Sequence, residues 1–314
     1  MLQQTTVRAV LPYYDRFLRR FPDLAALARA RLSSVLAAWS GLGYYRRARH
    51  LHAAARHIRD LHQGRFPRRF EEILALPGIG RYTAGAIASI AFGQRRPVLD
   101  GNVARVLSRH LGLRGDPRTA ANTGRLWDEA SSWVESSTSP GDLNQALMEL
   151  GATLCTPALP ACGRCPVAAT CAARRAGLQL AIPPPRRRRE QIVLPLRLAL
   201  IERHGHILMR RRDGTGLMDG MWELPELDRR SQLAKGGDIR SEEEPLQVDR
   251  LEPFTSFRHT ITYRRLKVEV FRATLLAEPC GRDYRWVTTA RVRRLPASSM
   301  VAKALRKLTD GRGA

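Results

Sequence analysis

Asp100 is the carboxylate whose neighbours in the sequence most favour a catalytic role. It opens a D-G-N turn before a helix expected from about Val103 to Leu111, and it follows the segment L-P-G-I-G-R-Y. Gly78 and Gly80 of that segment have no Cβ, so the backbone there can adopt a positive φ and approach another molecule closely. The amides that open the next helix would point outward with the positive end of the helix dipole behind them, which suits a phosphate. A carboxylate beside a phosphate clamp indicates chemistry on a nucleic acid.

The spacing of apolar residues predicts helices around these groups. The stretch from Phe70 to Leu76 is typical of the end of a helix, and the apolar run from Ala84 to Ala91 belongs to the next one. No strand-like alternation appears before Ile182. Residues 1–181 are therefore predicted to form an all-α domain.

A segment rich in proline and arginine, residues 182–191, separates this domain from one with a different periodicity. The stretches from Val193 to Glu202 and from Leu266 to Leu276 alternate like strands, and Ser298 to Leu308 is typical of a closing amphipathic helix. Residues 192–314 are therefore predicted to be an α+β domain, which the stiff linker joins to the first.

Four cysteines lie close together after the helical part of the chain. Their spacing is C-x6-C-x2-C-x5-C, formed by Cys155, Cys162, Cys165 and Cys171. Four thiolates in so short a loop can bind either a [4Fe–4S] cluster or one zinc ion, and the spacing alone leaves both open. Disulfides are not expected between them if the protein is cytoplasmic.

The charge balance favours a polyanionic partner. The formal net charge is +24, from 53 lysines and arginines against 29 acidic residues. No apolar run is long enough to cross a bilayer, and polar residues interrupt the start of the chain where a signal peptide would be apolar. We therefore expect a cytoplasmic, nucleoid-associated protein with no membrane partner.

Several segments in this order resemble the MutY-type adenine DNA glycosylases of the helix-hairpin-helix superfamily of base-excision enzymes. They are M-L-Q-Q-T at Met1–Thr5, G-L-G-Y-Y-R-R-A-R at Gly41–Arg49, L-P-G-I-G-R-Y-T-A-G-A-I at Leu76–Ile87 followed by L-D-G-N-V, and the cysteine cluster. The resemblance implies a multidomain protein: an all-α helix-hairpin-helix glycosylase domain with a [4Fe–4S] loop, then an α+β domain like MutT and other Nudix proteins. It also implies that the cysteines hold a [4Fe–4S] cluster.

The resemblance implies hydrolysis of the N-glycosidic bond of adenine mispaired with 8-oxoguanine or guanine in double-stranded DNA, by a monomer. Such a reaction passes through an oxocarbenium-like sugar, which a carboxylate can stabilise. By resemblance Asp100 is that carboxylate, and Tyr82 and Asn102 support it. The residues alone leave Asp100 a second role, because D-G-N would also cap the following helix.

The resemblance also assigns contacts with DNA to residues near the start of the chain and at the hairpin. The expected DNA-binding residues are Gln3, Gln4, Thr5, Tyr44, Gly78 and Gly80, and the adenine pocket is expected to include Leu2 and Gln145.

In the second domain the segment F-R-H-T-I-T-Y at Phe257–Tyr263 resembles the loop with which the family reads 8-oxoguanine. The resemblance assigns this role to Phe257, Arg258 and His259. The alternative for Phe257 and His259 is a strand end that packs on the domain core. The helical glutamates of a Nudix hydrolase are not recognisable, since Glu242–Glu244 fall in a loop-like stretch, so we expect recognition and not pyrophosphate hydrolysis.

Lysine usage distinguishes this chain from relatives that also cut the strand. Bifunctional relatives carry a lysine at the position of Tyr82 and form a Schiff base with the sugar. No lysine precedes Lys235 here. We therefore expect base removal without strand cleavage, and the alternative of an endonuclease III-type pyrimidine glycosylase is disfavoured.

The family's general acid raises a further alternative. In the family M-L-Q-Q-T follows a helical segment that ends in S-E-V or similar, and its glutamate protonates the adenine. That glutamate would stand two residues before Met1. For a protein that begins at Met1, we expect DNA binding to persist and base removal to fall ~10²–10⁴-fold, which describes a catalytically impaired mismatch-binding protein.

Overall fold

The structure is a computed structural model that describes residues 1–3, 5–185, 190–212, 218–227, 246–279, 283–292 and 294–310. The chain divides into two compact units. One combines Met1–Arg56 with Arg189–Ala314, and the other is His57–Arg188. The expected DNA contact Gln4 and the loop-like acidic stretch Glu242–Glu244 lie outside the described residues.

The first unit begins with helices α1 (Val7–Arg20), α2 (Leu24–Arg29) and α3 (Leu32–Trp39), and α4 (Arg46–Leu61) runs across the division. Aromatic side chains hold these helices together, because Phe17 contacts Phe21 at a centroid distance of 4.9 Å and meets Trp39 edge-on at 5.8 Å. Asp23 caps α2 by accepting a 2.6 Å hydrogen bond from the backbone N–H of Ala26. None of the described helices is long and apolar enough to span a bilayer.

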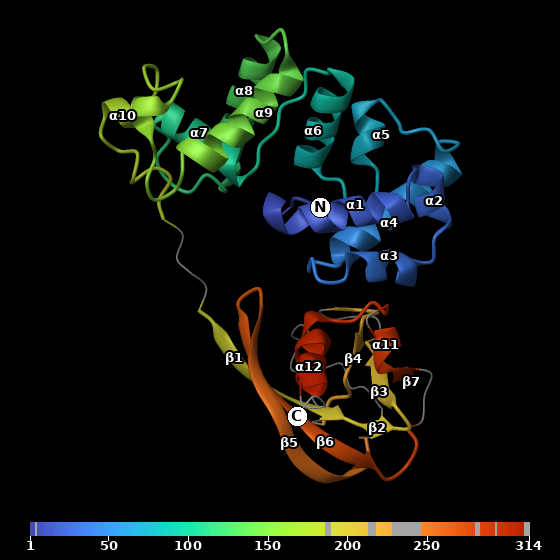
Figure 1. Ribbon diagram of the computed structural model, residues 1–314. Helices are drawn as coiled ribbons and strands as arrows, with labels where there is room; N and C mark the ends of the chain where they lie inside the picture. Colours follow the sequence, from blue (N-terminus) through green and yellow to red (C-terminus); the bar gives the residue numbers. More distant parts are fainter. Residues whose placement is uncertain are drawn as a thin grey trace. The chain divides into compact units, whose positions relative to one another are not determined.

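The rest of the first unit is built from two small sheets (Figure 1). Strand β6 (Arg264–Leu275) lies between β1 (Ile192–Leu200), which is parallel to it, and β5 (Val248–Ile261), which is antiparallel. The second sheet contains β2 (Glu202–Arg203), β3 (His206–Arg211), β4 (Trp222–Glu223) and β7 (Tyr284–Thr288). After β7 come the short helix α11 (Thr289–Val292) and α12 (Ser299–Asp310).

One face of α12 closes the core of this α+β part. Met300, Val301, Ala304 and Leu308 are all buried there, and they pack in one cluster with Leu266, Val268 and Val270 of β6. This burial follows from the spacing of the apolar residues on α12, which places them on one side of the helix. The predicted closing helix and the predicted strands around residues 193–202 and 266–276 are confirmed, with ends shifted by one to a few residues.

The regular secondary structure of the second unit is helical, and its described residues contain no strand. It contains α5 (Phe70–Leu74), α6 (Arg81–Phe92), α7 (Gly101–Leu111), α8 (Ala120–Glu135) and α9 (Pro140–Glu149). A π-helical turn (Leu150–Leu154), a 3₁₀ turn (Cys162–Arg164) and α10 (Ala172–Arg175) follow. Val103, Leu107 and Leu126 are fully buried in a cluster that joins α7, α8 and α9. The predicted all-α character of this part is confirmed.

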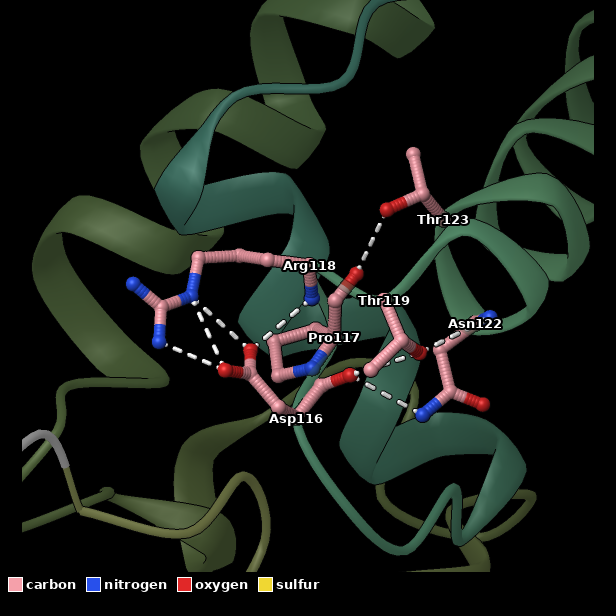
Figure 2. Close-up of polar contacts among 6 residues, drawn as sticks. All are labelled: Asp116, Pro117, Arg118, Thr119, Asn122 and Thr123. Carbon is pink, nitrogen blue, oxygen red and sulfur yellow. Dashed lines mark hydrogen bonds and ion pairs between the residues drawn. The ribbon is translucent and has the colours of Figure 1, made fainter.

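The turn before α8 shows how short polar residues fix a helix start. Figure 2 shows Asp116 accepting hydrogen bonds from the backbone and the guanidinium of Arg118, with which it also forms a 2.5 Å ion pair. Asn122 Nδ2 donates to the carbonyl of Asp116 at 3.0 Å, and the Thr123 hydroxyl donates to the carbonyl of Pro117 at 2.8 Å (Figure 2). The carboxylate of Asp116 therefore neutralises Arg118 locally, although both side chains are largely exposed.

Candidate active site and nucleic-acid interface

The glycine hairpin between α5 and α6 presents open backbone. Gly78 has a φ of +77°, a conformation that favours glycine. Gly80 is the N-cap of α6, and no side chain caps the opening amides of this helix. A Cβ placed on Gly80 would meet no atom within 4 Å. Amides without a side-chain cap and open space at Gly80 are what a bound phosphate would need, and phosphate binding here stays a prediction.

Asp100 caps α7 with one of its two carboxylate oxygens. Its Oδ1 accepts hydrogen bonds from the backbone N–H groups of Asn102 at 2.9 Å and Val103 at 2.8 Å. Its Oδ2 forms no hydrogen bond or ion pair among those found in the described part of the chain. The capping alternative is thus correct, but it is compatible with catalysis, because the two bonds fix the carboxylate and leave Oδ2 available.

Tyr82 lies in the first turn of α6 and feels the charge of Asp100. Burial raises the pKa of the Tyr82 hydroxyl, and the negative charge of Asp100 raises it further. The Tyr82 hydroxyl donates to the sulfur of Met148 on α9 at 3.1 Å. Helices α6, α7 and α9 therefore bring the hairpin, a neutral phenol and a carboxylate into one neighbourhood.

Asn102 is held by a residue that the sequence alone did not single out. Arg105, one turn further along α7, donates to Asn102 Oδ1 at 3.0 Å, to the carbonyl of Gly151 at 2.7 Å and to the carbonyl of Cys155 at 2.8 Å. Gly151 must be glycine for this packing, because a Cβ there would lie 2.7 Å from the Cβ of Asn102. Arg105 thus ties the start of α7 to the first cysteine of the loop.

Gln145 lies on the exposed side of α9 and donates to the carbonyl of Gly141 at 3.3 Å. Its neighbour Asn144 is fully buried and donates to the Ser89 hydroxyl and to the carbonyl of Arg96, each at 2.8 Å. These bonds dock α9 on α6 and so fix which residues of α9 can face a base. The only signal for Asn144 in the sequence is a polar residue at an otherwise core-facing position.

The four cysteines line one hollow together with apolar side chains and Arg109. Burial raises the pKa of the Cys165 thiol, and the charges of the other three cysteines raise it further. No group of His, Cys, Asp or Glu among the described residues is arranged to hold a single metal ion.

The buried charge of Arg109 indicates what kind of group this hollow can bind. Only 3% of its surface is exposed, and its guanidinium donates to the sulfur of Cys155 at 3.2 Å and to the carbonyls of Thr156 and Ile182, both at 2.8 Å. No carboxylate forms an ion pair with it within the described ranges. A buried cation needs a compensating negative charge. An anionic thiolate-ligated group in the hollow would provide that charge, so the residues present fit the expected cluster.

The start of the chain and the turn around Tyr44 are joined by Arg47. Its guanidinium donates to the carbonyl of Met1 at 2.6 Å, to the carbonyl of Gln3 and to the Thr5 hydroxyl at 2.9 Å. It also lies 5.4 Å from the centroid of the Tyr44 ring. Four predicted contact residues in the first unit are thereby brought together: Leu2, Gln3, Thr5 and Tyr44.

Tyr44 is held in a conformation that is costly for a non-glycine residue. Its φ is +49°, and 47% of its surface is exposed. Leu2 is 58% exposed. Side chains this exposed do not pack in a core, and Tyr44 in addition lies on a strained turn, which supports a contact role for both. The sequence missed Arg47, whose only signal was its place in the G-L-G-Y-Y-R-R-A-R segment.

The prediction of a loop that begins at Phe257 is wrong. Phe257 lies near the end of strand β5, and the turn to β6 follows only at Thr262 and Tyr263. Phe257 pairs with Val268 of β6 and packs against the core, whereas Arg258 lies on the exposed face. The strand alternative is therefore correct for Phe257. A strand was not expected here because β5 contains a proline and two shifts of register.

Lys303 of α12 fastens this end of β5. Its ammonium donates to the carbonyl of Arg258 at 3.2 Å and lies 5.7 Å from the centroid of the Phe257 ring. Burial lowers the pKa of His259, and the positive charge of Lys303 lowers it further, so the imidazole is neutral at pH 7. The only signal for Lys303 in the sequence is that the chain has few lysines.

Two family profiles match the chain. The profile described as HhH-GPD superfamily base excision DNA repair protein matches residues 1–129, and that of the NUDIX domain matches residues 197–307. With the open glycine hairpin and the capped carboxylate on α7, these matches define a helix-hairpin-helix base-excision DNA repair protein that carries a C-terminal Nudix domain.

Whole-chain relatives narrow the class. The human adenine DNA glycosylase is 34% identical over 98% of this chain and 66% of its own length, and the mouse adenine DNA glycosylase is 34% identical over 99% of this chain and 70% of its own length. The chain belongs to the MutY-type adenine DNA glycosylase family. It spans about two thirds of the length of these relatives. A solved structure described as a thermostable thymine-DNA glycosylase is 29% identical, with a TM-score of 0.50 over 56% of this chain and 80% of that one.

Proposed function

We propose that this protein removes adenine from double-stranded DNA where it is mispaired with 8-oxoguanine or, more slowly, with guanine. The observation that carries the proposal is the carboxylate of Asp100. Its Oδ1 is fixed by two backbone N–H groups, and its Oδ2 has no hydrogen-bond or ion-pair partner among the described residues, beside a hairpin suited to phosphate. Membership of the adenine DNA glycosylase family supports the choice of base.

The reaction begins when the adenine nucleotide leaves the base stack, at a cost of a few kcal/mol. Cleavage of the N-glycosidic bond leaves positive charge on the sugar, and Asp100 stabilises that charge electrostatically until a water molecule adds at C1′ and gives the abasic sugar. Asn102 and Arg105 hold the start of α7 so that Asp100 keeps its orientation. Protonation of the departing adenine is assigned to the glutamate that the family carries ahead of M-L-Q-Q-T.

The reaction stops after base removal. Tyr82 occupies the position at which bifunctional relatives carry a lysine, and a phenol cannot form a Schiff base with the sugar. Burial and the charge of Asp100 both raise the pKa of Tyr82, so the hydroxyl stays protonated and is a poor nucleophile. The DNA strand therefore remains intact until it is treated with base or heat.

The cysteine loop holds a [4Fe–4S] cluster in this proposal, with Cys155, Cys162, Cys165 and Cys171 as ligands. A thiolate-ligated group in the loop would neutralise the buried Arg109, and the family resemblance favours a [4Fe–4S] cluster over zinc as that group. Such a cluster braces the loop and neutralises Arg109. Visible charge-transfer absorbance together with bound iron would support it, and stoichiometric zinc without iron would replace it.

DNA recognition is shared between two parts of the first unit. Gln3 and Tyr44, which both contact Arg47, are proposed to enter the stack beside the partner base. The stretch Phe257–Tyr263, which ends β5 and forms its turn, is proposed to read 8-oxoguanine. Arg258, which is exposed, is proposed to make the contact, and Phe257 and His259 are proposed to act by fixing the strand against α12.

A substrate panel tests this specificity. Duplexes with adenine opposite 8-oxoguanine, guanine or thymine, and one with an oxidised pyrimidine, are treated with the longest natural form of the protein and then with alkali. We expect the fastest cleavage with adenine opposite 8-oxoguanine, slower cleavage with adenine opposite guanine, and no cleavage of the other two duplexes. The double substitution Phe257→Ala, His259→Ala should reduce the ratio of the 8-oxoguanine rate to the guanine rate. If the variant keeps the wild-type ratio, these residues do not take part in recognition. Preferential cleavage at the oxidised pyrimidine would favour an endonuclease III-type activity.

A further inference from the structure

Arg81, the first residue of α6, is stacked on Trp127 of α8. The guanidinium carbon lies 3.8 Å from the ring centroid, the shortest of the arginine–aromatic distances found among the described residues. Arg81 is exposed, and the adjacent Gly80 borders open space. The stacking thus holds the charge of Arg81 next to Gly80, where the hairpin ends and α6 begins.

No acidic partner of Arg81 is found in the structure's described ranges, in contrast to two other arginines of the same unit. Arg118 is paired with Asp116 at 2.5 Å (Figure 2), and Arg96, which stacks on Phe70, also lies 3.6 Å from Glu71. The charge of Arg81 is oriented but not neutralised.

Stacking leaves the hydrogen-bonding edge of a guanidinium free. The ring contacts the flat face of the group, whereas its five N–H donors lie in the plane and point outward. Those donors match two oxygens of a phosphate in a bidentate arrangement. A stacked arginine has also lost part of its rotamer freedom before any ligand arrives, so less is lost on binding.

We propose that Arg81 binds a DNA phosphate next to the one at the glycine hairpin and that Trp127 is the residue that positions it. Arg81 thereby adds a directed cation to the uncharged amides of Gly80 and α6. This inference rests on the proposed DNA-binding function. It adds a contact that neither the hairpin geometry nor the glycine motif requires.

The test is the salt dependence of binding to a duplex with 8-oxoguanine opposite 2′-fluoro-deoxyadenosine, whose glycosidic bond resists hydrolysis. Loss of one phosphate contact should lower the slope of log K against log salt by about 0.9. The affinity ratio between 50 and 200 mM salt should therefore shrink about 3.5-fold in Arg81→Ala. Arg118→Ala is the matched control, because it removes the same charge from a neutralised site, and its slope should stay close to the wild type.

Trp127 is tested separately. Trp127→Leu keeps the charge of Arg81 but loses the stacking face, so the slope should hold while affinity falls about 2- to 5-fold. Trp127→Phe keeps a ring and should recover most of that loss. Thermal unfolding of each variant checks that the fold persists.

Each result bears on one statement. A wild-type slope in Arg81→Ala, or an equal drop in Arg118→Ala, would overturn the phosphate contact. Wild-type affinity in Trp127→Leu, or no recovery in Trp127→Phe, would overturn the positioning role. If the wild-type protein itself binds DNA without salt dependence, the proposed function fails first, and that outcome is distinct from failure at Arg81.

Discussion

Replacing Asp100 by asparagine separates the two roles that its position allows. The amide oxygen of asparagine can still accept the backbone N–H groups of Asn102 and Val103, but the negative charge is lost. Asparagine and aspartate cap helices about equally well, so Asp100→Asn should keep its free energy of unfolding within about 0.5 kcal/mol of the wild type. Adenine release should fall about 10²–10³-fold, the usual effect of removing one preorganised electrostatic group.

Asp100→Ala removes the cap as well as the charge. Loss of the cap should cost about 1–2 kcal/mol of stability, or about 2–8 °C in Tm. Asp23 offers a matched control, since it caps α2 by accepting a 2.6 Å bond from the N–H of Ala26. Asp23→Ala should lower the Tm by a similar amount and leave the rate per folded molecule unchanged.

The assay is single-turnover adenine release with protein in excess over a duplex that contains one 8-oxoguanine·adenine pair. Thermal unfolding is followed on the same samples by circular dichroism. Base release by Asp100→Asn at the wild-type rate would refute the catalytic role and leave Asp100 as a helix cap only.

Three further results are expected from the packing. Gly151→Ala should lower the free energy of unfolding by about 1–3 kcal/mol in thermal denaturation, because its Cβ would lie 2.7 Å from that of Asn102; unchanged stability would mean that the two helices are loosely packed. Lys303→Met should reduce the preference for 8-oxoguanine over guanine about 3- to 10-fold in adenine-release rates, whereas Lys307→Met, one turn further on, should not; equal effects would assign the loss to charge alone. The lowered pKa of His259 means that the unfolded chain binds a proton more readily than the folded one, so its contribution to stability is present above pH 6.5 and is lost as the pH falls below it. His259→Asn should weaken the fall in Tm between pH 7 and pH 5, and an unchanged fall would show that His259 does not contribute.

Local signals in the sequence were sufficient for the parts of the site that depend on backbone. Gly78, Gly80 and the D-G-N turn each impose a conformation on their immediate neighbours, and the structure has the hairpin and the cap at those places. The cysteine spacing likewise fixes which residues can share one hollow. These features involve residues close together along the chain.

The residues that the sequence missed act over long separations. Arg47 binds the Met1–Thr5 segment more than forty residues away, and Arg105 and Lys303 also bind backbone carbonyls in distant segments. A carbonyl exists at every residue, so no residue type marks the acceptor in the sequence. The contacts of Arg47, Arg105 and Lys303 therefore cannot be predicted from the sequence and are visible only in the three-dimensional structure.

Strand β5 was missed for a different reason. Its sequence carries charged residues and Pro253, and its register shifts between Asp249 and Glu252 and again between Pro253 and Thr255. Each shift breaks the alternation of period two on which strand prediction relies. Proline is tolerated because β5 is an edge strand of the β1-β6-β5 sheet.

The central claim is tested most directly by identifying the base that leaves. The longest natural form of the protein that contains residues 1–314 is mixed with a duplex carrying one 8-oxoguanine·adenine pair, and the released base is identified by mass spectrometry while the strand is examined on a gel. The account predicts free adenine and an intact strand that breaks only after alkali. A protein that binds this duplex and carries its cluster, yet releases no adenine or cuts the strand unaided, would contradict it.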